Sequence, residues 1–401
     1  VIKVVNNWVG AAAKELKIRL SNVNIKVDNT SRYASGGRDF YFDEWNYYYG
    51  VSAAQVKGTG NTKIELDGQN VLDSDVRSSP TTSVFWAGLN KKGNGNLTIT
   101  DETSDKGETI TAKEETDTSG SLRAEGGCYR SDSLSGGGAA IGGNYGQATE
   151  NITIEGYATV KANTKDNNGA GIVGGAGAKG SNITIQGHAN VTANGGWSGA
   201  GIGGGSQGND GGGDAENIII QGYSKVTATG CGGAAIGGGV GSGYACSKIT
   251  EAKNIVIRDH ATVVAKSDGG SWLGNGCAAI GAAGNKDTEA EVIIGTPGAT
   301  AATGDVHVTA TGLYGSAIGS GTKDTKVTIQ GNATIRTASI RNSTAIGSNY
   351  GNVEVNIKDN VTIDTDNASA TAEPDNAGSS IGGGDIRGDS NRKVVVNIDG
   401  G

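Results

Sequence analysis

The chain has 401 residues and a formal net charge of −8, with 71 glycines, three prolines and no methionine. Its charges are spread along the sequence without a basic stripe, which argues against nucleic acid as a partner. No apolar run approaches the roughly 20 residues of a membrane helix, so we expect no membrane insertion. The glycines lack the three-residue period of collagen, and regular apolar alternation argues against a disordered chain.

The first 60 residues are less regular than the rest. Residues 15–20 and 23–27 alternate apolar and polar side chains, as half-buried strands do. A loop at residues 38–49 then gathers many of the chain's few aromatic residues. We interpret residues 1–60 as an N-terminal cap and a first irregular coil with an aromatic loop, since the end of a repeat array must be covered.

From residue 61 the pattern becomes regular and runs to residue 401. Residues 62–68 and 96–100 are predicted strands, and an insertion from Asp101 to Ser135 is expected to lengthen the next unit. A motif then returns in which one aliphatic residue stands among glycine, alanine and serine, at Ile141, Ile172, Ile202, Ile236, Ile280, Ile318, Ile346 and Ile381. Leu89 precedes them at the equivalent place. A motif that recurs along the chain in this way indicates a repeat architecture.

One unit can be followed from Asn182. Residues 182–186 and 189–193 alternate, and a turn leads to a third short extended piece at residues 200–205. Three strands per unit without a helical period predict an all-β, single-stranded parallel β-helix of about ten coils. It is expected to be right-handed, as parallel crossovers are.

Equivalent side chains of successive coils are expected to stack about 4.8 Å apart. The recurring motif isoleucines would form one inward ladder. The other two inward ladders are predicted at Ile152, Ile183, Ile218 and Ile255, and at Val160, Val191, Val226, Val263 and Ile335.

The segments Lys63–Asn70 and Gly95–Asp101, together with the GAGIGGG-type repeats, resemble bacterial secreted or cell-surface β-helix proteins. The resemblance covers about residues 60–400. It implies a secreted or cell-surface, carbohydrate-binding or adhesin-like protein with a glycan or another host or cell-surface ligand. The chain ends on a strand without a recognisable cap, so we expect further domains of the same polypeptide.

Two groups of aromatic residues are candidate ligand contacts. The first is the aromatic loop, with Phe40, Tyr41, Trp45, Tyr47 and Tyr48. Flat rings bind the apolar faces of sugars, although the same rings could instead pack against the side of the helix. The second is a corner column of Tyr157, His188, Tyr223 and His260 on four successive coils. This column could bind a linear glycan, or it could be a self-stacking ladder that only stabilises the corner.

Two groups of acidic residues suggest other kinds of site, namely a catalytic site and a calcium site. Asp39, Asp43 and Glu44 beside the aromatic loop are the candidate acid and nucleophile of a β-helix glycoside hydrolase. Asp210, Asp214 and Glu216 lie in or next to a glycine-rich loop and could bind calcium through their oxygens; no other cofactor is expected.

The four cysteines form no CxxC pair, which argues against a zinc site. Cys231 and Cys277 both come shortly before the motif isoleucine of adjacent coils and could form a disulfide, or they could be small buried residues.

The sequence therefore predicts an extracellular, non-catalytic binding or adhesion module for glycans. A glycoside hydrolase and a structural spacer at the cell surface are the alternatives.

Overall fold

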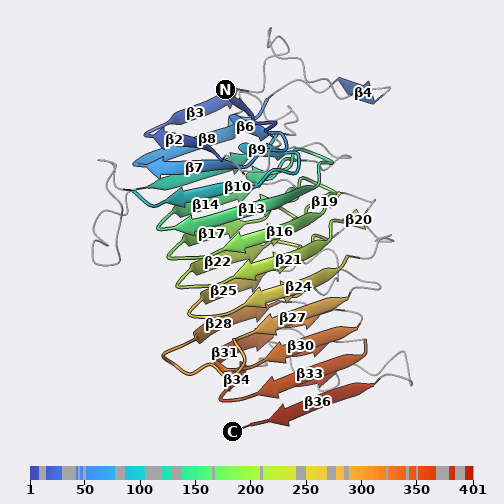
Figure 1. Cartoon of the computed structure of the whole chain (residues 1–401). Coiled ribbons are helices and arrows are strands. Elements are labelled where there is room, and N and C mark those ends of the chain that lie inside the picture. Colours follow the sequence, from blue (N-terminus) through green and yellow to red (C-terminus); the bar gives the residue numbers. More distant parts are fainter. Residues whose placement is uncertain are drawn as a thin grey trace.

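The computed structural model describes residues 1–8, 15–28, 42–43, 46–47, 51–76, 86–103, 120–127, 137–164, 168–207, 211–240, 250–268, 277–283, 289–313, 315–321, 324–339, 343–348, 351–366, 379–383 and 393–400. These residues form strands and turns but no helix. They build three long parallel sheets, to each of which a full coil contributes one strand (Figure 1). The predicted parallel β-helix is confirmed.

Sheet A holds the shortest strands. Its order is β1 (Ile2–Val5), β6 (Ala54–Lys57), β9 (Leu89–Lys92), β12 (Ile141–Gly142), β15 (Ile172–Val173), β18 (Ile202–Gly203), β23 (Ile236–Gly237), β26 (Ile280–Gly281), β29 (Ile318–Ser320), β32 (Ile346–Ser348) and β35 (Ile381–Gly383).

Sheet B follows sheet A within each coil. Its order is β2 (Leu16–Ser21), β7 (Thr62–Asp67), β10 (Leu97–Asp101), β13 (Thr149–Gly156), β16 (Gly180–Ile185), β21 (Ala215–Ile220), β24 (Ala252–Ile257), β27 (Ala290–Ile294), β30 (Thr325–Ile329), β33 (Val353–Lys358) and β36 (Val394–Asp399).

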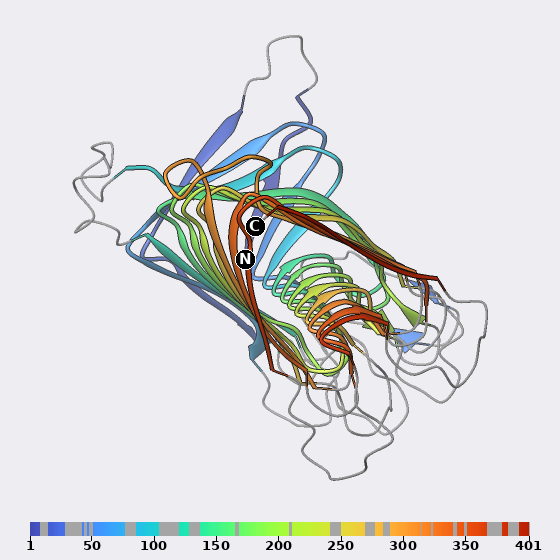
Figure 2. The same cartoon turned by 90° about the horizontal axis from the view of Figure 1, so that it is seen from below.

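Sheet C completes the coil. Its order is β3 (Asn24–Asp28), β8 (Gln69–Val76), β11 (Ser121–Gly126), β14 (Thr159–Thr164), β17 (Asn190–Asn194), β22 (Lys225–Gly230), β25 (Thr262–Ser267), β28 (Asp305–Gly312), β31 (Asn332–Ser339) and β34 (Thr362–Asp366). Seen along the axis, the coils lie over one another, and sheet A forms the tight bend (Figure 2).

The three predicted ladders form the core. Ile172 pairs with Ile202, Ile183 with Ile218, and Val191 with Val226, and all six side chains are fully or almost fully buried. Strict alternation along sheets B and C turns these side chains inward and their neighbours outward. Each coil therefore buries its apolar face only against the coils above and below it, as expected of a solenoid.

Glycine follows the motif isoleucine in seven of the eight coils that carry it, and Val173, with φ +106°, is the exception. Gly203 and Gly237 have φ of +134° and +142°, a region that residues with a Cβ rarely adopt. A Cβ on Gly203 would also lie 2.0 Å from the carbonyl oxygen of Gly237 on the next coil. The tight bend of sheet A thus depends on the small residues that mark the repeat in the sequence.

One feature of the early coils differs from expectation. The segment 101–135 is not simply an insertion, because it contains β11, which pairs in register with β8 and β14. The strands expected at residues 15–20 and 23–27 are present as β2 and β3, and β2 pairs with β7 over six residues. The alternation of β11 is short and lies between irregular segments, which hid it in the sequence.

A ligand-binding candidate at the corner between sheets B and C

The corner between sheets B and C has the same backbone form in four successive coils. Gly156, Gly187 and Gly222 have φ between +66° and +70°, and Asp259 occupies the equivalent place with φ +65°. The left-handed conformation turns the chain sharply, so that the next residue lies at the outer edge of the corner. In these four coils, the residues at that place are the members of the predicted aromatic column.

Tyr157, His188, Tyr223 and His260 form a continuous stack of parallel rings. Successive ring centroids lie 4.7, 5.1 and 4.5 Å apart, and the ring planes differ by 1° to 5°. The column predicted from the sequence is therefore assembled, and its rings pack on each other. Such ring pairs typically contribute about 0.5–1.5 kcal/mol each beyond the area they bury.

The stacking decides which parts of the rings can meet a ligand. Both faces of His188 and Tyr223 are occupied by neighbouring rings, so a sugar cannot stack on them. Their edges stay accessible, and Tyr223 is 55% exposed. The column thus offers ring edges with polar atoms at the spacing of the coils, instead of one broad apolar platform.

A ladder of planar polar side chains runs beside the rings. The Gln186 amide donates to Glu155 at 2.7 Å, and the Gln221 amide donates to Gln186 at 2.7 Å. Arg258 on the following coil donates to the Gln221 carbonyl oxygen through Nε and Nη2, at 2.8 and 2.6 Å. These bonds fix the amide orientations, so the remaining donors and acceptors point in defined directions.

A shallow depression of about 290 Å³ follows this ladder along the helix axis. Its lining consists of Glu102, Glu155, Gly156, Gln186, Gly187, Gln221, Gly222 and Asp259. The three glycines leave its floor without side chains, and each is followed directly by a ring of the column. The corner therefore combines planar hydrogen-bonding groups, exposed backbone and ring edges in one line, which we call the corner groove.

At its N-terminal end the corner groove reaches a cluster of charges. Lys63 donates to Glu102 at 2.8 Å and lies 3.6 Å from a Glu155 carboxylate oxygen. Burial alone would lower the pKa of Lys63, but the hydrogen bond and charge of Glu102, together with Glu155, outweigh it and raise that pKa. At this end of the groove, the carboxylates of Glu102 and Glu155 are therefore held by ion pairs with the Lys63 ammonium group.

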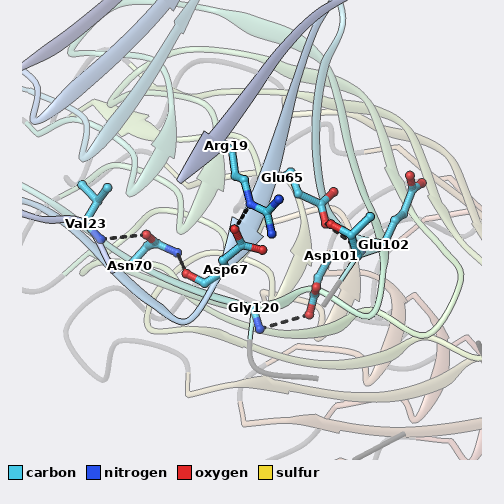
Figure 3. Close-up of polar contacts among 9 residues, drawn as sticks. Arg19, Val23, Glu65, Asp67, Asn70, Asp101, Glu102 and Gly120 are labelled. Atoms are coloured by element: carbon cyan, nitrogen blue, oxygen red, sulfur yellow. Dashed lines mark hydrogen bonds and ion pairs between the residues drawn. The ribbon is translucent and has the colours of Figure 1, made fainter. Parts of the chain in front are cut away.

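The same corner in the preceding coils is closed by buried carboxylates (Figure 3). Asp67 and Asp101 are each 1% exposed. Asp67 pairs with Arg19, and Asp101 accepts a 3.1 Å hydrogen bond from the Gly120 amide. Since these oxygens are directed into the protein, they stabilise the corner and do not line the groove.

A second ladder marks the opposite margin of sheet B. Asn151, Asn182, Asn217 and Asn254 all have φ between +54° and +61°, and each later amide donates to the preceding one at 2.8–2.9 Å. With outward residues of sheet B they line a depression of about 370 Å³. Asparagine tolerates the left-handed conformation better than most residues, which accounts for its recurrence at this position inside the strands of sheet B.

The predicted aromatic loop lies largely outside the described residues. Asp39, Phe40, Tyr41, Glu44, Trp45 and Tyr48 are not among them. The backbone of β4 (Phe42–Asp43) pairs antiparallel with that of β5 (Asn46–Tyr47). The predictions made for the rings and acids of this loop, including Asp43 and Tyr47, therefore stay predictions.

The predicted calcium residues are engaged in other contacts where they can be described. Asp214 accepts a 3.0 Å hydrogen bond from the Glu251 amide, and Glu216 forms an ion pair with Lys179. Asp210 lies outside the described residues. Among the residues that are described, no group of three or more His, Cys, Asp or Glu side chains is arranged to hold a metal ion.

The predicted disulfide between Cys231 and Cys277 is not formed. Cys277 is buried and its thiol donates to the Gly232 carbonyl oxygen at 2.6 Å, whereas Cys231 is exposed. The register explains the difference. Ile280 pairs with Ile236, so Cys277 stacks over position 233 and is two residues out of step with Cys231.

The polar ladder beside the rings was missed by the sequence analysis, although a signal for it was present. Each ring except the last follows glycine, and that glycine follows Glu155, Gln186 or Gln221. The recurring order of a planar polar residue, glycine and an aromatic ring places all three in stacked columns.

Comparisons of the chain with family models, with curated proteins and with solved structures found no match. No helix among the described residues is both long and apolar enough to cross a membrane.

Proposed function

We propose that the chain is an extracellular, non-catalytic binding module that holds a glycan along the corner groove. The observation that carries this proposal is the line of fixed planar side chains, Glu155, Gln186 and Gln221, beside a row of ring edges. Amides and carboxylates in fixed orientations suit the paired hydroxyls of a sugar, because each group presents both its oxygens or an oxygen and a nitrogen.

The charge of the groove favours a neutral glycan over an acidic one. Three of its lining residues are carboxylic acids, Glu102, Glu155 and Asp259. An acidic sugar placed there would face like charges, which cost free energy on desolvation. The groove is also shallow and open, so it suits contact with an extended chain better than enclosure of a reacting bond.

The test is a glycan array with the wild-type chain and a Gln186→Ala, Gln221→Ala variant. Two lost hydrogen-bonding groups are expected to weaken binding of a neutral glycan about tenfold. Gln330→Ala is the matched control, since Gln330 continues the same column but lies outside the groove. Unchanged thermal unfolding of the double variant would exclude a folding defect. Equal binding by wild type and double variant would overturn the role of the groove.

Two further variants separate the remaining alternatives. Loss of retention in a Trp45→Ala, Tyr48→Ala variant alone would move the binding site to the aromatic loop. Release of new reducing ends by the wild type, abolished in an Asp39→Asn, Asp43→Asn, Glu44→Gln variant, would favour the glycoside hydrolase. If the wild type binds no glycan, a structural spacer becomes the favoured function.

A further inference from the structure

The outer faces of the three sheets differ sharply in charge over the same six coils. The six strands of sheet A from β12 to β29 contain no charged residue. The six strands of sheet B from β13 to β30 carry four acids and two lysines. The six strands of sheet C from β14 to β31 carry Lys161, Lys225, Lys266 and Arg336 against one acid, Asp305.

The basic residues of sheet C all point outward. They alternate with the buried ladder of Val160, Val191 and their equivalents, and all four are exposed. Lys266 pairs with Asp268 at 2.8 Å, and Asp305 is occupied by His307 at 3.1 Å. Within the described part of the chain, Lys161, Lys225 and Arg336 form no ion pair. A chain of net charge −8 thus presents one face on which three of four cations form no ion pair among the described residues.

Threonine hydroxyls occupy three of the four positions between Lys161 and Arg336 in one row of sheet C, and the exposed Val264 occupies the fourth. Lys161 pairs across the sheet with Thr192, which pairs with Thr227, and Thr309 pairs with Arg336. Neighbouring coils are about 4.8 Å apart, so the hydroxyls form rows along the helix axis. A hydroxyl both donates and accepts hydrogen bonds, which suits a partner that is itself rich in hydroxyl groups.

We propose that the outer face of sheet C, from β14 to β31, binds an acidic polysaccharide lying along the helix axis. Four cations are distributed over five coil steps, or about 24 Å. Double-stranded DNA would present more than about ten phosphates over that length, far more than these cations can neutralise. A polymer with sparse carboxylates and many hydroxyls matches both the cations and the threonine rows. This surface is separate from the corner groove and needs no ligand there.

The experiment is affinity electrophoresis of the whole chain in gels containing sodium polygalacturonate, with fully methyl-esterified, neutral polymer as the comparison. A Lys161→Gln, Lys225→Gln, Arg336→Gln variant removes the three unpaired cations. A Lys253→Gln, Lys326→Gln, Lys358→Gln variant removes the same charge from sheet B and is the matched control. We expect the wild type to be retarded by the acidic polymer only, and the sheet C variant to need about tenfold more polymer for the same retardation.

The alternatives have distinct outcomes. Equal weakening in both triple variants would show a general charge effect and overturn the proposal, as would the absence of retardation of the wild type. Stronger binding to duplex DNA or to phosphatidylserine vesicles than to polygalacturonate would overturn the assigned partner. The Gln186→Ala, Gln221→Ala variant should bind the acidic polymer like the wild type, so failure of the corner groove and failure of this face can be told apart.

Discussion

The first coils and the later coils solve the same packing problem in different ways. Four charged side chains are buried among the described residues, namely Asp67, Lys91, Asp101 and Glu125, and all four lie before residue 126. From residue 137 onward, the described coils bury only apolar and uncharged polar side chains. The difference shows that a regular repeat lets like residues stack on like, whereas interrupted coils need an individual partner for each polar group.

The early and later coils should differ most in the effect of removing one partner of an ion pair, and Arg19 is the partner to remove in an early coil. Its loss in Arg19→Ala would leave the Asp67 carboxylate, 1% exposed, without its charged partner. Because the Arg19 side chain is itself 44% exposed, water can partly replace it, and the free energy of unfolding should fall by about 2–3 kcal/mol. Lys253→Ala, which removes an exposed ion pair of a later coil, should cost under about 1 kcal/mol in the same denaturant titration. Equal losses of unfolding free energy in the two variants would contradict the contrast between the early and later coils.

A second test uses the buried lysine of β9. Burial lowers the pKa of Lys91 to about 8 from 10.5, against the opposing charge of Glu150. The unfolded chain therefore binds its proton more tightly, and the free energy of unfolding should rise with pH between about 8 and 10.5. The destabilisation is fully present below pH 8, where the side chain is charged in both states.

Lys91→Met should accordingly stabilise the protein by about 3 kcal/mol at pH 7 and flatten this rise. Urea unfolding at pH 7, 9 and 10.5 measures both effects. Lys92→Met, at the exposed neighbouring position, is the control and should keep the wild-type pH profile. A Lys91→Met profile that still rises by the same amount would assign the pH dependence to another group.

The ring column tests the regular coils. Tyr223 stacks on two rings and Tyr157 on one ring of the column, so Tyr223→Ala should cost about 2 kcal/mol and Tyr157→Ala about 1 kcal/mol. Thermal unfolding of both variants, and a double-mutant cycle of Tyr223 with His188, give the stacking contribution directly. A zero coupling energy would mean that the rings are only neighbours.

An effect smaller than that of Tyr223→Ala is expected at the corner glycines. Gly187 has φ +69°, and a Cβ there would lie 3.0 Å from the Gly156 amide nitrogen, so Gly187→Ala should cost about 1.5 kcal/mol. Gly187→Asn should cost less, because asparagine tolerates this conformation and Asp259 already adopts it at the equivalent position. Chemical denaturation compares the two variants, and a larger loss for Asn would point to a clash instead of backbone strain.

Much of the candidate site could be predicted because the ring column depends only on the repeat. Once the coils are aligned by their isoleucines, Tyr157, His188 and Tyr223 must stack. The amide ladder follows from the same alignment and was missed only because glutamine is common on exposed strands. Arg19 with Asp67 was not predictable, since 48 residues separate them and no periodic pattern connects them.

The sequence by itself determined the parallel β-helix, its three inward ladders and the stacked column. Each of these depends on local alternation and on a repeat whose equivalent residues lie directly over one another. Only the tertiary structure decided that the basic residues gather on sheet C and that Cys231 and Cys277 are out of step. These features depend on which face of the sheet each side chain occupies and on the exact register between coils. Where the repeat length varies, the order of residues alone fixes neither the face nor the register.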